Sequence, residues 1–314
     1  MRKGHAMTAR ELINRGTQEL AGRGVADAET DSRLLFCHLT GVSRSRLFME
    51  YPRKMTDAEI AAYKALIRRR GTGEPLQYIV GETEFMGLRF RVDSRVLIPR
   101  PETELLVEKA LELLKKLTTE NPAAKERKPV SVLDCCCGSG AIGLSVAALA
   151  EMPVCVSCSD ISPDALEVAR RNAGELVFFG SFGDGRRGSV EFLCGSFLEP
   201  AAGGRQFDMI LCNPPYICDE VIPTLQKEVR EHEPMIALTG GADGLEPYRE
   251  MIPQLARHLT AGGIAMFEIG HDQGEAVANM FAETGEFEPA QVMRDLAGRN
   301  RIVWTRRRYP QSAV

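Results

Sequence analysis

The stretch VSVLDCCCGSGAIG, residues 130–143, decides the fold, because it joins an apolar strand to a helix through a glycine-rich turn. Gly138, Gly140 and Gly143 let the backbone turn tightly and come close to a ligand, which the N-terminus of the next helix then faces. Open α/β folds bind nucleotide-like ligands at such a turn. The G-x-G-x-x-G spacing alone is a weak signal, so it leaves the identity of the ligand open.

Strands and helices alternate beyond this turn. Helices are predicted for PDALEVARRNA and YREMIPQLARHL, and strands for VSVLDC, VCVSCSD, VEFLC, FDMILCN, GGIAMFEIG and RIVWTR. Such alternation predicts a mostly parallel sheet with helices on both faces. The segment GSFGDGRRGS, residues 180–189, is expected to form a flexible loop on this frame.

The nine cysteines of the 314-residue chain are expected to be reduced, because the basic start MRKGHAMTARE lacks the apolar core of an export signal. We therefore expect a cytoplasmic protein. Cys155 and Cys158 lie three residues apart on a predicted strand, so their side chains point to opposite faces and cannot share a tetrahedral metal ion. Adjacent Cys135, Cys136 and Cys137 cannot all converge on one ion either. The sequence predicts no metal site and no membrane span.

An acidic residue ends the second strand. Asp160 follows Gly140 by 20 residues. A carboxylate at that place can accept hydrogen bonds from both hydroxyl groups of a ribose. Dinucleotides and S-adenosylmethionine (SAM) both carry this sugar, so Asp160 fits either ligand.

The fourth strand distinguishes these ligands, because it ends in Asn213-Pro214-Pro215-Tyr216. The two prolines remove two backbone donors and fix the direction of the chain. Backbone carbonyls and the Asn213 side-chain oxygen are then left as a rigid cluster of acceptors. A carboxamide or an aryl amino group has two N–H donors for such a cluster, and Tyr216 can cover its flat face. A dehydrogenase has no use for this arrangement, so the sequence favours a SAM-dependent methyltransferase that acts on an amino nitrogen.

The N-terminal part is predicted to form a small helical bundle. Thr8-x-x-Glu11 and Thr56-x-x-Glu59 are capping boxes, and each precedes an apolar-periodic run. Residues 1–70 hold 14 basic and 8 acidic side chains, a net charge of +6 in a chain whose formal total is −4. A basic part on an acidic body favours an acidic partner, either a protein or RNA, and a solvated helical surface is an equal alternative.

A connector joins this bundle to the α/β part. Residues 78–98 carry aromatic and β-branched side chains with glycines between them, which is typical of a hairpin. Pro101 suits the first turn of the next helix, and the polar stretch TTENPAAKERKP that follows this helix is typical of a linker. The expected organisation is a helical substrate-recognition domain over 1–77, a β-hairpin connector over 78–100 and a methyltransferase domain over 101–314.

Four segments carry a family resemblance. The chain resembles the release-factor glutamine N5-methyltransferases, the HemK-type family, in GEPLQYIVG (73–81), VLIPRPETE (96–104), NPPYI (213–217) and RIVWTR (301–306). The resemblance implies a class I SAM-dependent methyltransferase, which is a Rossmann-like α/β fold with a mostly parallel seven-stranded sheet and a small N-terminal helical bundle. It also implies methyl transfer to the glutamine of the Gly-Gly-Gln motif in peptide chain release factors.

The resemblance assigns roles to individual residues. The cofactor would be held by Cys136, Cys137, Gly138, Ser139, Gly140, Asp160, Phe197 and Asn213. Within this set, Asp160 would bind the ribose and Phe197 would lie beside the adenine. The substrate glutamine would be held by Asn213, Pro214, Pro215 and Tyr216. Asn213, Pro214 and Tyr216 would be the catalytic residues. The family usually has G/C-T-G-T/S-G in the turn, where this chain has Cys136 and Cys137 at the first two positions.

Three other functions remain alternatives. N6-adenine methyltransferases use a similar N/D-P-P-Y/F segment, but the acidic body lacks a basic target-recognition region of useful size. We therefore expect no stable binding to nucleic acid. A glutamine in a ribosomal protein is another candidate substrate, which only the resemblance disfavours. A SAM-binding scaffold without catalysis is the third alternative, and the intact acceptor cluster argues against it.

Overall fold

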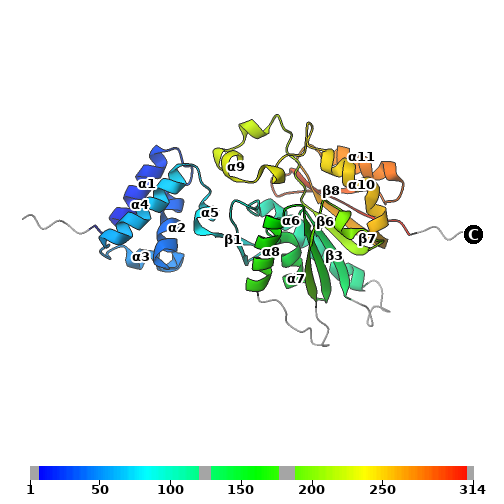
Figure 1. Ribbon diagram of the computed structural model, residues 1–314, viewed down its shortest axis with the longest axis horizontal. Coiled ribbons are helices and arrows are strands. Elements are labelled where there is room, and N and C mark those ends of the chain that lie inside the picture. The colour runs from blue at the N-terminus through cyan, green and yellow to red at the C-terminus, as the bar shows by residue number, and fades with distance from the viewer. Residues whose placement is uncertain (1–6, 120–128, 177–187, 310–314) are drawn as a thin grey trace, which may run out of the picture. The chain divides into compact units, whose positions relative to one another are not determined.

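The computed structural model describes residues 7–119, 129–176 and 188–309, and Figure 1 shows their helices and strands, with labels where there is room. The chain forms two compact units. The first unit contains the N-terminal residues up to Glu82 together with Gln226–His232, and the second contains the other residues from Thr83 onward. Most of the expected linker TTENPAAKERKP and of the expected loop GSFGDGRRGS lies outside the described residues.

The first unit is the predicted bundle of helices, and both predicted capping boxes are present. The Thr8 side chain accepts a hydrogen bond from the Glu11 N–H, and the Glu11 carboxylate accepts one from the Thr8 N–H. Thr56 and Glu59 repeat this arrangement. Such caps satisfy backbone donors that have no partner inside the helix. The helices are α1 (Ala9–Gly22), α2 (Ala28–Thr40), α3 (Leu47–Glu50), α4 (Asp57–Gly71), α5 (Leu76–Val80) and α9 (Lys227–His232), with a 3-10 turn η1 (Arg44–Arg46).

Tyr63 organises the core of this bundle. Its hydroxyl group lies 2.6 Å from Ser32 Oγ and donates to the Ser32 carbonyl at 2.9 Å. A Cβ atom on Gly16 would stand 2.5 Å from the Tyr63 oxygen, so a glycine is needed where α1 meets α4. The other buried side chains around it include Leu12, Ile13, Leu20, Leu35, Phe36 and Ile67.

A β-hairpin follows the bundle, but it begins later than residue 78. It consists of β1 (Glu82–Phe85) and β2 (Leu88–Arg91), whereas residues 78–80 belong to α5. Gly81 ends α5 in the left-handed conformation, with φ at 82°, a region in which glycine has no Cβ clash. Periodicity could not separate five helical residues from a strand at this place, because one helical turn is too short to show a helical pattern.

The second unit is built on a mostly parallel sheet, as the alternation of strands and helices predicts, and this sheet has the seven strands that the family resemblance implies. The strand order is β5-β4-β3-β6-β7-β9-β8, and β9 alone runs opposite to the other strands of the sheet. The strands are β3 (Val130–Cys135), β4 (Val154–Asp160), β5 (Ser189–Cys194), β6 (Phe207–Cys212), β7 (Leu259–Glu268), β8 (Gln291–Arg294) and β9 (Asn300–Arg306). The segment-by-segment prediction missed β8, because this edge strand of four residues is largely exposed and has no apolar run.

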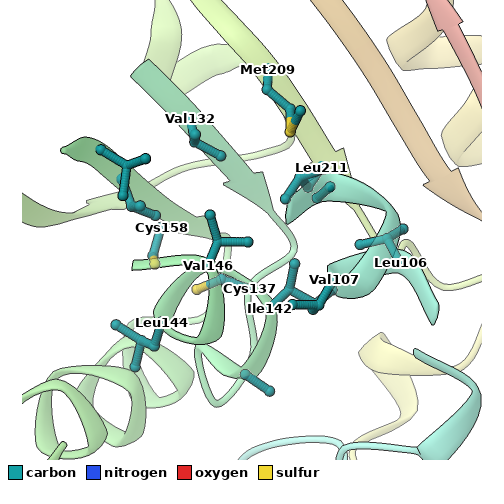
Figure 2. Packing of buried hydrophobic residues seen from close by; sticks show 14 of the residues in the cluster. Leu106, Val107, Val132, Cys137, Ile142, Leu144, Val146, Cys158, Met209 and Leu211 are labelled. Atoms are coloured by element: carbon teal, nitrogen blue, oxygen red, sulfur yellow. The ribbon is translucent and has the colours of Figure 1, made fainter. Parts of the chain in front are cut away.

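Helices cover both faces of this sheet. Val132 of β3 packs in one apolar cluster with Leu106, and the next residue, Leu133, packs in the other cluster with Ile252. Alternate residues of a strand point to opposite faces, so each cluster covers one face. Figure 2 shows the cluster that contains Val132. The helices are α6 (Pro101–Thr119), α7 (Ala141–Leu149), α8 (Pro163–Glu175), α10 (Glu246–His258) and α11 (Gly274–Thr284).

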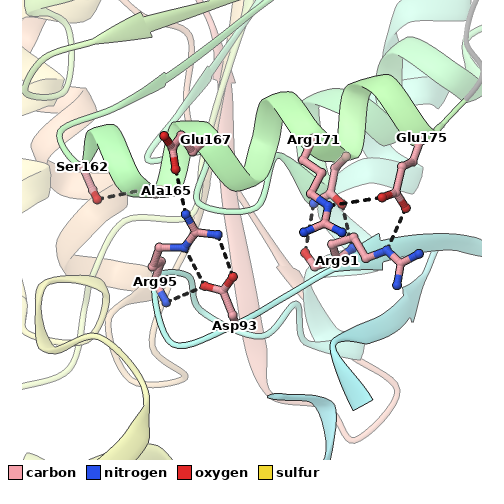
Figure 3. A network of polar contacts seen from close by, with 9 residues as sticks. Arg91, Asp93, Arg95, Ser162, Ala165, Glu167, Arg171 and Glu175 are labelled. Atoms are coloured by element: carbon pink, nitrogen blue, oxygen red, sulfur yellow. Dashed lines mark hydrogen bonds and ion pairs between the residues drawn. The ribbon is translucent and has the colours of Figure 1, made fainter. Parts of the chain in front are cut away.

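Ion pairs connect the hairpin and the segment after it to α8 (Figure 3). Arg95 lies 2.8 Å from Asp93 and 2.9 Å from Glu167, and Arg91 lies 2.7 Å from Glu175. Exposed pairs of this kind contribute at most about 1 kcal/mol each, so their effect is mainly to fix the course of the segment. None of the described helices has the length and apolar character needed to cross a membrane.

Candidate active site

A cavity of about 350 Å³ lies where three neighbouring strands end. Its wall includes residues that follow β3, residues at the end of β4, and residues that follow β6. The predicted site residues found in this wall are Cys136, Cys137, Gly138, Ser139, Asp160, Phe197, Asn213 and Pro215. The cavity is therefore at the carboxyl edge of the sheet, where open α/β folds bind ligands. Three further predicted residues, Gly140, Pro214 and Tyr216, do not line it.

The turn after β3 adopts the left-handed backbone that its glycines predict. Gly138 and Gly140 have φ values of 54° and 80°, and Cys136 has a φ of 57°. A Cβ atom on Gly140 would stand 2.8 Å from the Leu144 side chain, so Gly140 serves the packing of α7 instead of the cavity wall. Cys136 is strained relative to a glycine at the same position, because side chains disfavour this conformation.

Asn172 stabilises this turn through hydrogen bonds. Its buried amide donates to the Ser139 carbonyl at 2.9 Å and to the Arg91 carbonyl at 3.1 Å, and its oxygen accepts from the Arg91 N–H. The turn is thereby tied to β2. No local pattern in the sequence predicts these contacts, since Asn172 lies 33 and 81 positions from its two partners.

Gly143 and Asp134 fix the base of α7. The Gly143 N–H donates to Asp134 Oδ2 at 2.8 Å, and a Cβ atom on Gly143 would stand 2.9 Å from this oxygen and from Cys158 Sγ. Asp134 is completely buried, and burial raises its pKa to about 7. The third glycine of the G-x-G-x-x-G spacing is therefore required for helix–strand packing.

We expect Asp134→Asn to remove a pH dependence of stability. The pKa of Asp134 is about 7 in the folded protein, whereas in the unfolded chain the same carboxyl group loses its proton at about pH 4. Between these values the folded state binds one more proton, so the free energy of unfolding falls by about 1.4 kcal/mol for each unit of rising pH. The asparagine oxygen still accepts from Gly143. Urea unfolding should show the variant gaining stability over the parent protein up to about pH 7, with no further gain above it. A difference that does not vary with pH would contradict this prediction.

The cysteines pack as small apolar side chains. Cys137 and Cys158 face each other in the core below the turn (Figure 2). Their mutual hydrogen bond and burial raise the pKa of the Cys137 thiol well above its usual value. On β4, Cys155 is half-buried while Cys158 is buried. Within the described part of the chain, no three histidine, cysteine or acidic side chains gather as a metal site would require.

Asp160 is held by the turn that it faces. Its two carboxylate oxygens accept from the Gly138 N–H at 2.8 Å and the Ser162 N–H at 2.9 Å. Each oxygen keeps a lone pair for a further donor, such as a ribose hydroxyl group. The next residue, Ile161, also lines the cavity and is 52% exposed, which gives an apolar surface for a flat ring. The cavity therefore fits SAM in size and in the chemistry of its wall.

Asn213 presents acceptors at the end of β6. Its Nδ2 donates to Thr103 Oγ1 at 3.4 Å. Among the residues that the structure describes, none donates a hydrogen bond to Asn213 Oδ1 or to the Pro214 carbonyl. Tyr216 is turned to other partners, since its hydroxyl group donates to Glu268 Oε1 at 3.1 Å and its carbonyl accepts from Gln273 Nε2 at 3.0 Å.

Several residues of the cavity wall had no predicted role. Arg100 and Thr103 come from the segment IPRPETE, and Arg100 forms an ion pair with the buried Glu233. Gly240 packs against the backbone after the two prolines, because its Cβ atom would stand 2.8 Å from Tyr216 Cα. The wall also includes Ile236, Ala237 and Thr239. These residues lie far apart in sequence, so only the fold brings them together.

The sheet, the glycine turn and the acceptor cluster together define a class I methyltransferase. The release factor glutamine methyltransferase of Moorella thermoacetica is 38% identical over 96% of this chain and 99% of its own length. The chain belongs to the release factor glutamine methyltransferase family. The protein of the same name from Agrobacterium fabrum is 37% identical over 97% of this chain and 99% of its own length.

The two parts of the chain also match separate family models. A PrmC N-terminal domain matches residues 11–81, and a methyltransferase domain matches residues 132–232. The solved release factor-specific protein-(glutamine-N5) methyltransferase of Alicyclobacillus acidocaldarius is 28% identical, with a TM-score of 0.41 over 70% of this chain and 100% of that one. The hMettl16 catalytic domain in complex with MAT2A 3′UTR hairpin 6 is 13% identical, with a TM-score of 0.51 over 82% of this chain and 84% of that one, and it shares the fold.

Proposed function

We propose that this protein transfers a methyl group from SAM to the side-chain amide nitrogen of the glutamine in the Gly-Gly-Gln motif of peptide chain release factors. The acceptor pair at the end of β6 carries this proposal. Asn213 Oδ1 and the Pro214 carbonyl match the two N–H donors of a carboxamide, and no described residue donates to either oxygen. The names of the curated relatives support the same substrate.

The chemistry requires placement and charge stabilisation. SAM supplies a methyl group that the positive charge on its sulfur has already activated. A carboxamide nitrogen is a poor nucleophile, because its lone pair is delocalised into the carbonyl group. Asn213 and Pro214 would hold the amide nitrogen in line with the methyl carbon. As the new nitrogen–carbon bond forms, the carbon–sulfur bond breaks, and the nitrogen then releases one proton to water. As positive character builds on the nitrogen, its N–H groups become stronger donors, so both hydrogen bonds strengthen in the transition state.

The remaining predicted residues complete the proposed site. In this proposal the turn Cys136–Gly140 and Asp160 bind the cofactor, Phe197 lies beside the adenine, and Pro215 and Tyr216 support the substrate amide. The basic N-terminal part, predicted over 1–77, recognises the release factor at a distance from the reacting atom. The proposal places the enzyme in the cytoplasm, where translation occurs.

Incubation with isotopically labelled SAM and a purified release factor tests the proposal. Mass spectrometry should locate one methyl group on the glutamine of the Gly-Gly-Gln motif. A release factor with asparagine in place of that glutamine is the control, and it should stay unlabelled. Label that appears only on a ribosomal protein or on adenine in a nucleic acid would assign the protein to one of the alternative substrates instead.

Asp160→Ala is expected to weaken SAM binding by about 1.5–3 kcal/mol, the range for hydrogen bonds to a charged group. Asp160→Asn, which keeps one acceptor for the Gly138 N–H, should weaken binding less. Isothermal titration with SAM measures both constants. An unchanged affinity in the alanine variant would remove Asp160 from the cofactor site.

A further inference from the structure

A buried carboxyl group lies behind the acceptor cluster. Glu268, the last residue of β7, is 3% exposed. Its Oε1 accepts the hydroxyl proton of Tyr216, and within the described residues its buried Oε2 has no partner at hydrogen-bond distance. An acidic side chain is rarely buried to this extent without a role for its acceptors.

Thr103 connects this carboxyl group to Asn213. Its side chain is buried in the first turn of α6, and it faces Glu268 on one side and Asn213 Nδ2 on the other. A threonine hydroxyl group has a single proton. Burial raises the pKa of the Glu268 carboxyl group, and the neighbouring Thr103 hydroxyl group lowers it.

The hydrogen bond between Asn213 and Thr103 fixes the orientation of the Asn213 amide. Thr103 Oγ1 accepts from Asn213 Nδ2 at 3.4 Å, so the amino group of the amide faces Thr103, and the Thr103 proton stays available to another acceptor. Asn213 Oδ1 then points away from Thr103 and is available to the substrate. The opposite amide orientation would make Thr103 the donor and would direct the amino group of Asn213 toward the place where the substrate amide needs an acceptor.

Separate contacts fix the backbone of the segment Asn213–Tyr216. Gln273 Nε2 donates to the Tyr216 carbonyl and to the Gly244 carbonyl, at 3.0 and 3.1 Å. A Cβ atom on Gly244 would stand 2.4 Å from the Tyr216 carbonyl oxygen, so the two segments are in close contact. Loss of the Thr103 hydroxyl group should therefore release the orientation of the Asn213 amide and leave its position unchanged.

We propose that Glu268 and Thr103 are positioning residues, which orient the Asn213 amide with its oxygen toward the cavity and hold the hydroxyl group of Tyr216. This inference rests on the proposed function, because it specifies how the acceptor pair is aligned for the substrate amide. Neither residue touches the reacting atoms in this scheme. Both act through residues of the segment Asn213–Tyr216.

Substitutions at Thr103 provide the kinetic test. Thr103→Val keeps the shape but removes the hydroxyl group, and we expect kcat to fall about tenfold while KM for the release factor and Kd for SAM change less than about twofold. Thr103→Ser keeps the hydroxyl group and should recover most of the lost rate. Thr305→Val is the matched control, because Thr305 is equally buried and its hydroxyl group donates to the Glu288 carbonyl, away from the cavity. In an Asn213→Ala background, Thr103→Val should have almost no further effect, since its target is gone.

A spectroscopic readout separates this inference from the proposed function. The Asn213 side-chain amide gives a pair of ¹⁵N–¹H signals, identified by their loss in Asn213→Ala. Thr103→Val and Glu268→Gln should shift or broaden this pair, and Thr305→Val should leave it unchanged. Unchanged signals and an unchanged kcat in Thr103→Val would overturn the inference, as would a loss of rate that Thr103→Ser shares. If the parent protein methylates no release factor, the proposed function fails, and the amide signals still decide the orientation of Asn213.

Discussion

Replacement of Asn213 by alanine is expected to lower kcat for release-factor methylation by about 10²–10³-fold. This is the size of effect that follows the loss of one oriented hydrogen-bond partner in a transition state. In the proposed reaction, Asn213 Oδ1 accepts a bond that strengthens as charge develops on the substrate nitrogen, so the loss should appear in kcat more than in KM. Steady-state methylation at saturating SAM, with titration of the release factor, measures both constants.

Asn300→Ala is the matched control for this experiment. Asn300 begins β9 and donates to the His271 carbonyl at 3.2 Å, and it does not line the cavity. Its loss should leave kcat unchanged. If Asn213→Ala turned over a release factor at the full rate, the segment after β6 would be only a turn, and the proposal of amide methylation would fail with it.

Arg70→Ala is expected to lower the free energy of unfolding by about 3–5 kcal/mol, the cost of leaving a buried charge without its partner. Arg70 and Asp31 are about 6 and 7% exposed and lie 2.6 Å apart within the first unit. The same guanidinium group lies 2.5 Å from Glu228 of α9. Its loss leaves Asp31 buried and detaches α9 from α4, so the substitution should destabilise the whole helical unit.

The neighbouring Arg69 supplies the control for this prediction. Arg69 pairs with Glu74, but its side chain is 48% exposed. Exposed pairs contribute about 0–1 kcal/mol, so Arg69→Ala should be nearly neutral. Urea unfolding followed by circular dichroism compares the two variants. The double variant Asp31→Ala, Arg70→Ala should recover part of the loss, because it removes the unpaired carboxylate. Equal stabilities of Arg69→Ala and Arg70→Ala would show that the buried pair has no such role.

The sequence predicted those features that depend on local rules. The capping boxes at Thr8 and Thr56 were recognised because each uses two residues three positions apart. The strands β3, β4 and β6 were recognised because buried parallel strands are continuous apolar runs. The turn Cys136–Gly140 and Asp160 were predicted to lie at the same edge of the sheet, because the carboxyl ends of parallel strands meet there.

The missed features depend on contacts between distant residues. Thr103 and Asn213 are 110 positions apart, and no local pattern in IPRPETE predicts that this threonine faces an asparagine. Arg70 and Glu228 are 158 positions apart, so the placement of α9 in the first unit has no local signal. The prediction that Tyr216 covers the flat face of the substrate amide remains a prediction, and the structure adds a hydrogen bond to Glu268.

The placement of α9 has a consequence for the way this protein can be divided. The chain passes between its two units three times, at residues 82–83, 225–226 and 232–233. A protease that cuts at 82–83 frees most of the helical unit from the rest of the chain, but residues 226–232 of that unit stay covalently attached to the second unit. A fragment that ends at residue 82 lacks α9 and thus the Glu228 partner of Arg70. The helical unit is therefore complete only when translation has reached residue 232. It cannot finish folding on the ribosome before most of the methyltransferase sheet has been synthesised.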